Sequence, residues 1–220
     1  PNQFDAPLEW YFAPPSLLNI PPFRKDLSTF IVPTTVTTTL DGYPPTAVNP
    51  SGLFQLSRPA NGTGGRVQGI GVGYQHALRF LPKPLDGLGV AVNYTYADSK
   101  TPIANPLGGG TLPLVNLSRD TVNLVGYYED SDFTLRVAYT YRSKFLASVD
   151  SAALGGPKYQ DAYGQLDASA SVNVSDRIRF TFDATNLTKQ FVRQYNGTTN
   201  RLTLAMVNDT RYSAGISLAF

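Results

Sequence analysis

The residues of this chain that could do chemistry are charged side chains that recur at even spacings within several separate polar–apolar alternations. Side chains two residues apart in an extended segment project from the same face, so each of these charges falls among the small and polar residues. Nearby carboxylates can serve general acid–base chemistry in a closed pocket, but here both signs of charge are interspersed along several segments. This pattern favours a lattice of ion pairs and hydrogen bonds on one wall over direct contact with a substrate, and over catalysis. The members of the predicted lattice are Asp5, Glu9, Arg136, Asp167, Arg179, Asp183 and Arg211, with Arg142 and Lys144 further along one segment.

Other chemistry is poorly represented. The chain has no cysteine and one histidine, His76, so neither a thiolate site nor a histidine-rich metal site can be assembled. No Ser/His/Asp constellation is evident, and the glycines at 69, 71 and 73 do not have the spacing of a phosphate-binding loop. A formal net charge of +2 does not indicate a nucleic-acid-binding surface. We therefore expect no enzyme, metal or cofactor site, and no nucleic-acid partner.

The connecting segments carry aromatic and amide side chains beside cations. Aromatic faces next to planar polar groups suit sugars and aromatic chelates, although packing between loops explains the same residues equally well. The candidates for substrate contact are Arg142, Tyr159, Arg193, Tyr195 and Asn196.

The elements that must position these side chains are strands. A period of two between apolar and polar residues recurs about nine times, which predicts strands with one apolar and one polar face. The final alternation places Tyr212, Ile216, Leu218 and Phe220 on one face. The strands are expected within 3–12, 18–22, 66–80, 88–96, 122–128, 133–141, 162–174, 178–185 and 208–220. Pro21-Pro22 disturbs the second of them, and residues 26–66 are expected to form a long surface loop with a hairpin near 30–38 and 53–58.

Composition and connection lengths point to a membrane wall. Only 15% of residues are charged, against about 25% in soluble proteins. Mean hydropathy is nevertheless −0.16, as expected when half of the strand residues face lipid and half face water. Connections alternate between short and long, and aromatic residues gather at both ends of the apolar faces. We predict an all-β fold: an antiparallel, up-and-down segment of a transmembrane β-barrel, with short turns on the periplasmic side.

Several runs in the same order resemble a known family. The run DAYGQLDASASVNVSDRIRFTFDATNLT (161–188) and the closing RYSAGISLAF resemble the C-terminus of a TonB-dependent outer-membrane receptor. The upstream runs LEWYF, RKDLSTFIV, LDGLGVAVNYTYADS, NLVGYYE and FTLRVAYTYRSKFL resemble the same family. The resemblance implies that residues 1–220 are the C-terminal part of a barrel of about 22 strands, with the plug domain and signal peptide absent.

The resemblance also implies a function and a set of partners. The function is uptake of a bulky nutrient, such as an oligosaccharide or a ferric siderophore, across the outer membrane of a Gram-negative bacterium, without a cofactor. The partners are outer-membrane lipid, the missing plug domain and barrel strands, and the TonB complex, which acts through the plug. The barrel-assembly machinery would recognise the last strand through Tyr212, Ile216, Leu218 and Phe220.

Two alternatives remain open from the residues alone. A small passive porin or adhesin barrel would show the same alternation but an even strand count. A soluble all-β binding module would also show it, provided that the apolar faces packed against a second sheet.

Overall fold

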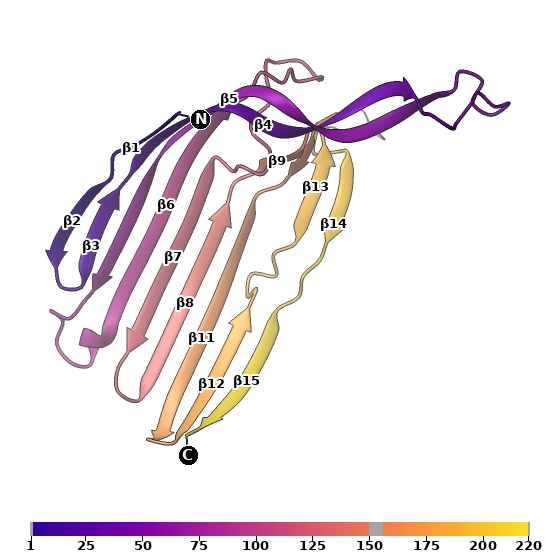
Figure 1. Cartoon of the computed structure of the whole chain (residues 1–220). Helices are drawn as coiled ribbons and strands as arrows, with labels where there is room; N and C mark the ends of the chain where they lie inside the picture. Colours follow the sequence, from indigo (N-terminus) through magenta and orange to yellow (C-terminus); the bar gives the residue numbers. More distant parts are fainter. Residues whose placement is uncertain (1, 150–155, 220) are drawn as a thin grey trace.

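The computed structural model describes residues 2–149 and 156–219, most of which form a curved, open antiparallel sheet (Figure 1). Within the described residues its strand order is β1-β4-β5-β6-β7-β8-β11-β12-β15, with β2 paired to β3 and β3 to β5. A separate sheet has the order β14-β13-β10-β9. The strands are β1 Asn2–Asp5, β2 Leu8–Ala13, β3 Ser16–Ile20, β4 Pro22–Thr39, β5 Leu53–Ala77, β6 Leu88–Lys100, β7 Asp120–Glu129, β8 Phe133–Arg142, β9 Phe145–Ser148, β10 Lys158–Gln160, β11 Tyr163–Ser175, β12 Ile178–Thr185, β13 Val192–Asn196, β14 Leu202–Met206 and β15 Arg211–Leu218, and the 3-10 helix η1 is Leu85–Gly87.

The eleven strands of the large sheet make nine spans. β1 and β2 are two parts of one span, because β1 pairs with β4 and β2 pairs with β3. β3 and β4 are likewise one span, since both pair with β5 on either side of Pro21. The predicted irregularity at Pro21-Pro22 is therefore a single interruption. The expectation of about nine antiparallel strands is confirmed.

The register sorts the side chains into an apolar face and a polar face. One apolar row runs Leu135, Ala170, Phe182 and Ala214 across four neighbouring strands. Slipping any strand by one residue would turn its whole apolar set to the other face. Ile70, Leu135 and Ile216 are 40%, 38% and 63% exposed, so no second sheet covers the apolar face at these positions. This exposure contradicts the alternative of a soluble module with a dry core.

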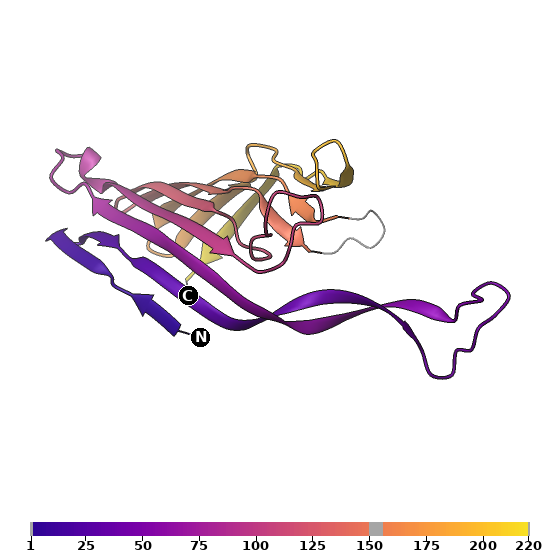
Figure 2. The same cartoon turned by 90° about the horizontal axis from the view of Figure 1, so that it is seen from above.

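The expectation of a long loop over residues 26–66 is wrong, except for its hairpin. β4 and β5 stay paired in one register from Pro22↔Ile70 to Thr39↔Leu53, and only residues 40–52 connect them. The far part of this pair extends well beyond the sheet as a two-stranded ribbon (Figure 2). The Thr- and Val-rich end of β4 favours an extended backbone, but threonine hides the polar–apolar alternation on which the prediction relied.

Connections of two kinds lie at opposite ends of the sheet. The turns joining β2–β3, β5–β6, β7–β8 and β11–β12 gather at one end, here called the short-turn end, and the long connections lie at the other, the long-loop end (Figure 1). Aromatic rings gather on the apolar face near the short turns. His76 stacks on Phe12 with ring centroids 5.2 Å apart, and Phe80 lies 5.7 Å from His76. Phe12 and Phe80 thus lie together near one end of the apolar face, where the sequence predicts that aromatic residues gather.

Two glycines of β5 allow neighbouring segments to approach closely. A Cβ atom on Gly69 would lie 2.0 Å from the carbonyl oxygen of Tyr96 and 2.7 Å from the Phe23 ring. On Gly71 it would lie 2.9 Å from the Pro21 ring. These two glycines therefore make room for the sheet's own neighbouring spans.

We expect Gly69→Ala to destabilise the folded protein by about 1–3 kcal/mol, because the backbone carbonyl of Tyr96 cannot move without breaking the β5–β6 ladder. Gly126→Ala is the matched control: a Cβ there meets no atom within 4 Å, so this variant should gain about 0.5–1 kcal/mol. The free energies follow from urea unfolding of the full-length gene product, monitored by heat-modifiable gel mobility. Equal stability of the two variants would contradict the close approach.

Candidate functional site: the polar wall and the loop sheet

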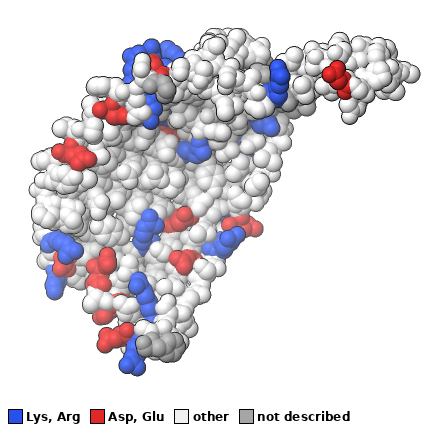
Figure 3. Space-filling model, viewed as in Figure 1, with Lys and Arg blue, Asp and Glu red and all other residues white. Residues whose placement is uncertain are grey.

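The polar face of the large sheet carries the charged residues that the sequence singles out. Cross-strand register places Arg136, Ser169, Asp183 and Ser213 in one row. Arg179 lies between Asn173 and Ser217 in another row, and Arg211 lies opposite Thr185. Asp5 and Glu9 reach the same face through pairing with Phe23 and Asn19. Figure 3 shows both signs of charge scattered over the visible face without a large patch of one sign.

The predicted lattice combined ion pairs with hydrogen bonds, and the contacts that hold its members in this structure are hydrogen bonds. None of the four ion pairs among the described residues joins two of the seven predicted members. Neutral partners hold several of them instead. Arg179 Nη2 donates to Ser171 Oγ at 2.6 Å, Asp167 Oδ1 accepts from Gln165 Nε2 at 2.8 Å, and Glu9 accepts from the Tyr11 hydroxyl at 2.7 Å.

The register explains why charges do not meet. Ser169 lies between Arg136 and Asp183, so these two residues are two strand spacings, about 10 Å, apart. Face parity predicted which residues share the wall. It could not predict their neighbours, which depend on the pairing register of each strand.

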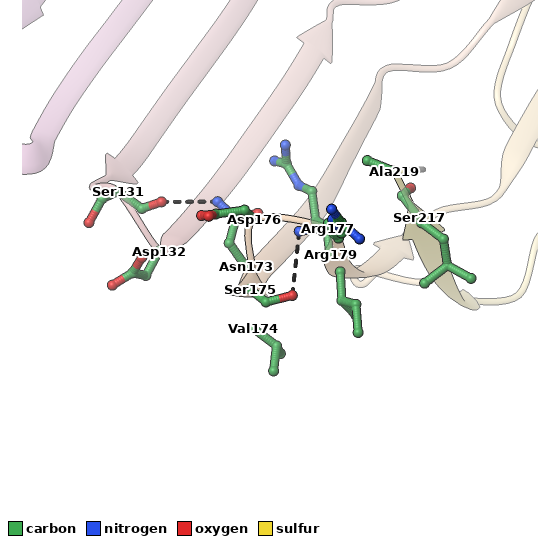
Figure 4. Close-up of a pocket in the computed structure, with 12 residues that line it drawn as sticks. Ser131, Asp132, Asn173, Val174, Ser175, Asp176, Arg177, Arg179, Ser217 and Ala219 are labelled. Atoms are coloured by element: carbon green, nitrogen blue, oxygen red, sulfur yellow. Dashed lines mark hydrogen bonds between the residues drawn. The ribbon is translucent and has the colours of Figure 1, made fainter.

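A recess of about 410 Å³ lies at the short-turn end, among the β7–β8 turn, the β11–β12 turn and the end of β15. Asn173 links two of these elements: its Nδ2 donates to the carbonyl of Ser131 at 2.9 Å and its backbone N–H to the carbonyl of Asp132 at 2.7 Å. Figure 4 shows Arg177 and Arg179 among the residues that line it. The recess therefore offers guanidinium and amide donors at one rim of the wall.

The turn beside this recess is fixed by a carboxylate. Asp130 Oδ1 accepts the backbone N–H groups of Asp132 and Phe133 at 2.9 and 2.7 Å. These two bonds, with a third from the Tyr128 hydroxyl, hold the pKa of the Asp130 carboxyl below its ordinary value. The ionised carboxylate thus closes the short β7–β8 connection.

Two segments expected to be loops, 145–160 and 187–207, form part of one structure at the long-loop end. β9 and β10 come from the first segment and β13 and β14 from the second, and they pair into the four-stranded loop sheet. The pairing between β10 and β13 matches Tyr159 with Tyr195, whose rings stack 5.9 Å apart. Phe145, Leu146 and Leu112 are buried beside it. The expectation that these two segments are loops is therefore wrong, because parts of both form strands that pair with each other.

The five candidates for substrate contact all lie in or beside the loop sheet. Tyr195 is only 5% exposed and Asn196 1%, so both side chains are buried. Tyr159 is half-buried and Arg193 is exposed. Arg142 lies 3.9 Å above the Phe145 ring, and its guanidinium donates to Ser118 Oγ at 3.0 Å and to the carbonyl of Asn116 at 3.2 Å.

Sequence reasoning missed the partners of these residues. Arg193 Nη2 contacts Asp161 Oδ2 at 2.8 Å, and Gln194 Nε2 donates to Gln160 Oε1 at 3.3 Å. The two residues of each pair are more than thirty positions apart in the sequence, so no local spacing predicts the contact. Burial raises the pKa of the Tyr159 and Tyr195 hydroxyls, and the nearby Asp161 carboxylate raises that of Tyr195 further.

Within the described residues, no group of three or more His, Cys, Asp or Glu side chains could hold a metal ion. The same residues include no helix whose length and hydropathy would carry it across a membrane. What the geometry defines is a curved wall: an exposed apolar face backed by a polar face, bounded by aromatic rings, with short turns at one end and elaborate loops at the other. These are the features of a transmembrane β-barrel wall.

The comparison with protein families agrees. The model of the TonB dependent receptor-like β-barrel matches residues 2–187, and the chain belongs to this family. It is accordingly an outer-membrane protein of the kind found in Gram-negative bacteria. No curated relative matches the chain.

Solved structures show the same fold. A mutant of the ferric enterobactin receptor from Pseudomonas aeruginosa matches with a TM-score of 0.61 and 15% identity, over 99% of this chain and 31% of that chain. The siderophore receptor from Acinetobacter baumannii matches with a TM-score of 0.57 and 16% identity, over 99% of this chain and 32% of that one. The chain thus spans about a third of the length of these receptors.

We expect Arg142→Lys to loosen the junction between the β6–β7 connection and the loop sheet. Lysine keeps the charge but loses the planar fork that bonds Ser118 and Asn116 together. Amide hydrogen exchange over residues 116–119 should accelerate about five- to tenfold. Arg193→Lys, whose partner Asp161 lies elsewhere, should leave those amides unchanged. Unaltered exchange in Arg142→Lys would show that the fork does not hold the junction.

We expect the loop sheet to lose stability in alkali. The folded-state pKa of Tyr159 and Tyr195 is raised, so the folded form binds more protons and its stability falls as pH rises above the ordinary tyrosine value of about 10. Tyr195→Phe should extend the stable range, whereas Tyr43→Phe, at an exposed position, should not. Tyrosinate absorbance and hydrogen exchange across pH measure this. Identical profiles for both variants would refute it.

Proposed function

We propose that this chain is the C-terminal part of the barrel of a TonB-dependent receptor, which takes up a bulky nutrient such as an oligosaccharide or a ferric siderophore. The observation that carries the proposal is the division of one continuous sheet into an exposed apolar face and a hydrogen-bonded polar face, in a chain of this receptor family. The apolar face contacts outer-membrane lipid. The polar face lines a hydrated interior occupied by a plug domain, through which the TonB complex supplies energy.

Substrate recognition is assigned to the long-loop end, which faces the cell exterior. There the Arg193 guanidinium is exposed and the Tyr159 ring is half-buried on the loop sheet, while Tyr195, which stacks on Tyr159, and Asn196 are buried. Planar cations and aromatic rings suit both catecholate-type chelates and sugar faces. The chemistry consists of selective binding followed by plug rearrangement, with no covalent step.

The last described strand suits recognition by the barrel-assembly machinery. Tyr212, Ile216 and Leu218 pair with Ala184, Phe180 and Ile178, which places them together on the apolar face of an edge strand. β15 ends the strand order, so one of its edges is free for pairing among the described residues. Phe220, the fourth predicted member of this signal, lies outside the described residues.

Energy-dependent uptake tests the proposal. Cells carrying or lacking the gene are supplied with radioactive iron on siderophores or with labelled oligosaccharides. Uptake of one class should require the gene and should stop when the proton gradient is dissipated. Arg193→Ala should reduce uptake about tenfold, whereas Arg79→Ala, at the short-turn end, should not. Gene-dependent uptake that persists without the gradient would identify a passive porin instead.

A further inference from the structure

One part of the apolar face carries charges at the edge of its belt. Moving toward the long-loop end, the last apolar row is Pro22, Ile70 and Tyr96. The next row on the same face is Arg24, Gln68 and Asp98, and the one after it is Asp26, Arg66 and Lys100. Aromatic residues mark membrane interfaces, so the charges immediately beyond Tyr96 lie at the level of lipid headgroups.

Two of these cations are held side by side. Asp26 bridges them: its Oδ1 lies 2.8 Å from Arg66 Nε and its Oδ2 lies 3.1 Å from Arg24 Nε. Each contact uses one of the five N–H donors of a guanidinium, so the outward donors stay available for another anion. Lys100 lies opposite Arg66 in the ladder and is exposed. Three cations thus outnumber the two carboxylates of these rows, Asp26 and Asp98.

An apolar groove adjoins the cations. It has a volume of about 440 Å³, and its lining includes Phe4, Pro22, Ile70 and Tyr96, with Arg24 and Gln68 at its charged end. Phe4 pairs with Arg24 in register, so its exposed ring shares the face. The site therefore combines an apolar groove with guanidinium groups at one end. This arrangement complements a molecule that carries an acyl chain and an anionic headgroup.

We propose that this face binds a phosphorylated lipid of the outer leaflet, with its phosphate on Arg24 and Arg66 and an acyl chain along the groove between Phe4 and Tyr96. Paired guanidiniums bind phosphate through short, charge-assisted hydrogen bonds, which favours phosphate over a zwitterionic headgroup. The inference rests on the proposed function, because that function places the apolar face in lipid with the long loops outside.

Lipid retention by the full-length protein in detergent tests the proposal. The probes are bisphosphorylated lipid A, its dephosphorylated form and inorganic phosphate, and bound molecules are counted by native mass spectrometry. We expect the wild type to retain the phosphorylated lipid, and the Arg24→Gln/Arg66→Gln variant to bind it about tenfold more weakly. Lys25→Gln is the matched control: it lies on the same strand but on the polar face, paired with Gln3 and Val67, and should bind like the wild type.

Several results would overturn the proposal. Equal retention of the dephosphorylated lipid would remove the role of phosphate, and equal binding of inorganic phosphate would define a free-anion site. Equal loss in Lys25→Gln would reduce the effect to net charge. If the double variant does not fold, judged by heat-modifiable mobility, Arg24→Gln alone makes the same comparison. Failure of energy-dependent uptake with intact lipid selectivity would count against the transport function alone.

Discussion

The structure depends on the requirement that every backbone N–H and C=O facing hydrocarbon be paired within the protein. The ladder from β4 to β15 meets it by continuous antiparallel pairing of adjacent spans. Even the interrupted spans comply: the Ala6 N–H donates to the Pro22 carbonyl at 3.2 Å, and the Gly71 N–H to the Pro21 carbonyl at 2.9 Å. The free edges of the described sheet belong to the first span and to β15, so barrel closure has to pair those two strands with others.

Once the ladder is fixed, period-two alternation decides what each side chain meets. Apolar residues occupy one face over the height of the belt. Within β4, β5 and β6, charge appears on that face only beyond the row of Tyr96, and Asp120 of β7 lies opposite Tyr96 itself. On the opposite face, charges lie among small polar residues, and neutral side chains bond three of them: Ser171 bonds Arg179, Gln165 bonds Asp167, and Tyr11 bonds Glu9. The wall is thereby polar without being strongly charged.

The predictable part of the fold is the part that local alternation controls. β7, β8, β11, β12 and β15 fall within or close to their expected ranges, because each alternates apolar and small polar residues between evident turns. The β4–β5 ribbon was not predicted, because threonine occurs on both of its faces. The loop sheet was not predicted, because β10 and β13 are more than thirty residues apart in the sequence and only tertiary packing brings them together. The partners within the charge lattice could not be predicted for a related reason: the face of a residue follows from local sequence, whereas its neighbour across the ladder does not.

The same distinction separates the spans from the loop sheet. The spans repeat a rule that any barrel of this kind obeys, whereas the loop sheet is built from non-local contacts particular to this sequence. Its buried residues include Leu146, Tyr195 and Asn196, and the Tyr195 ring stacks on that of Tyr159. A packed core keeps such side chains ordered before a ligand arrives, which lowers the entropic cost of binding. Two of the residues expected to contact substrate, Tyr195 and Asn196, thus belong to the buried part of the loop sheet.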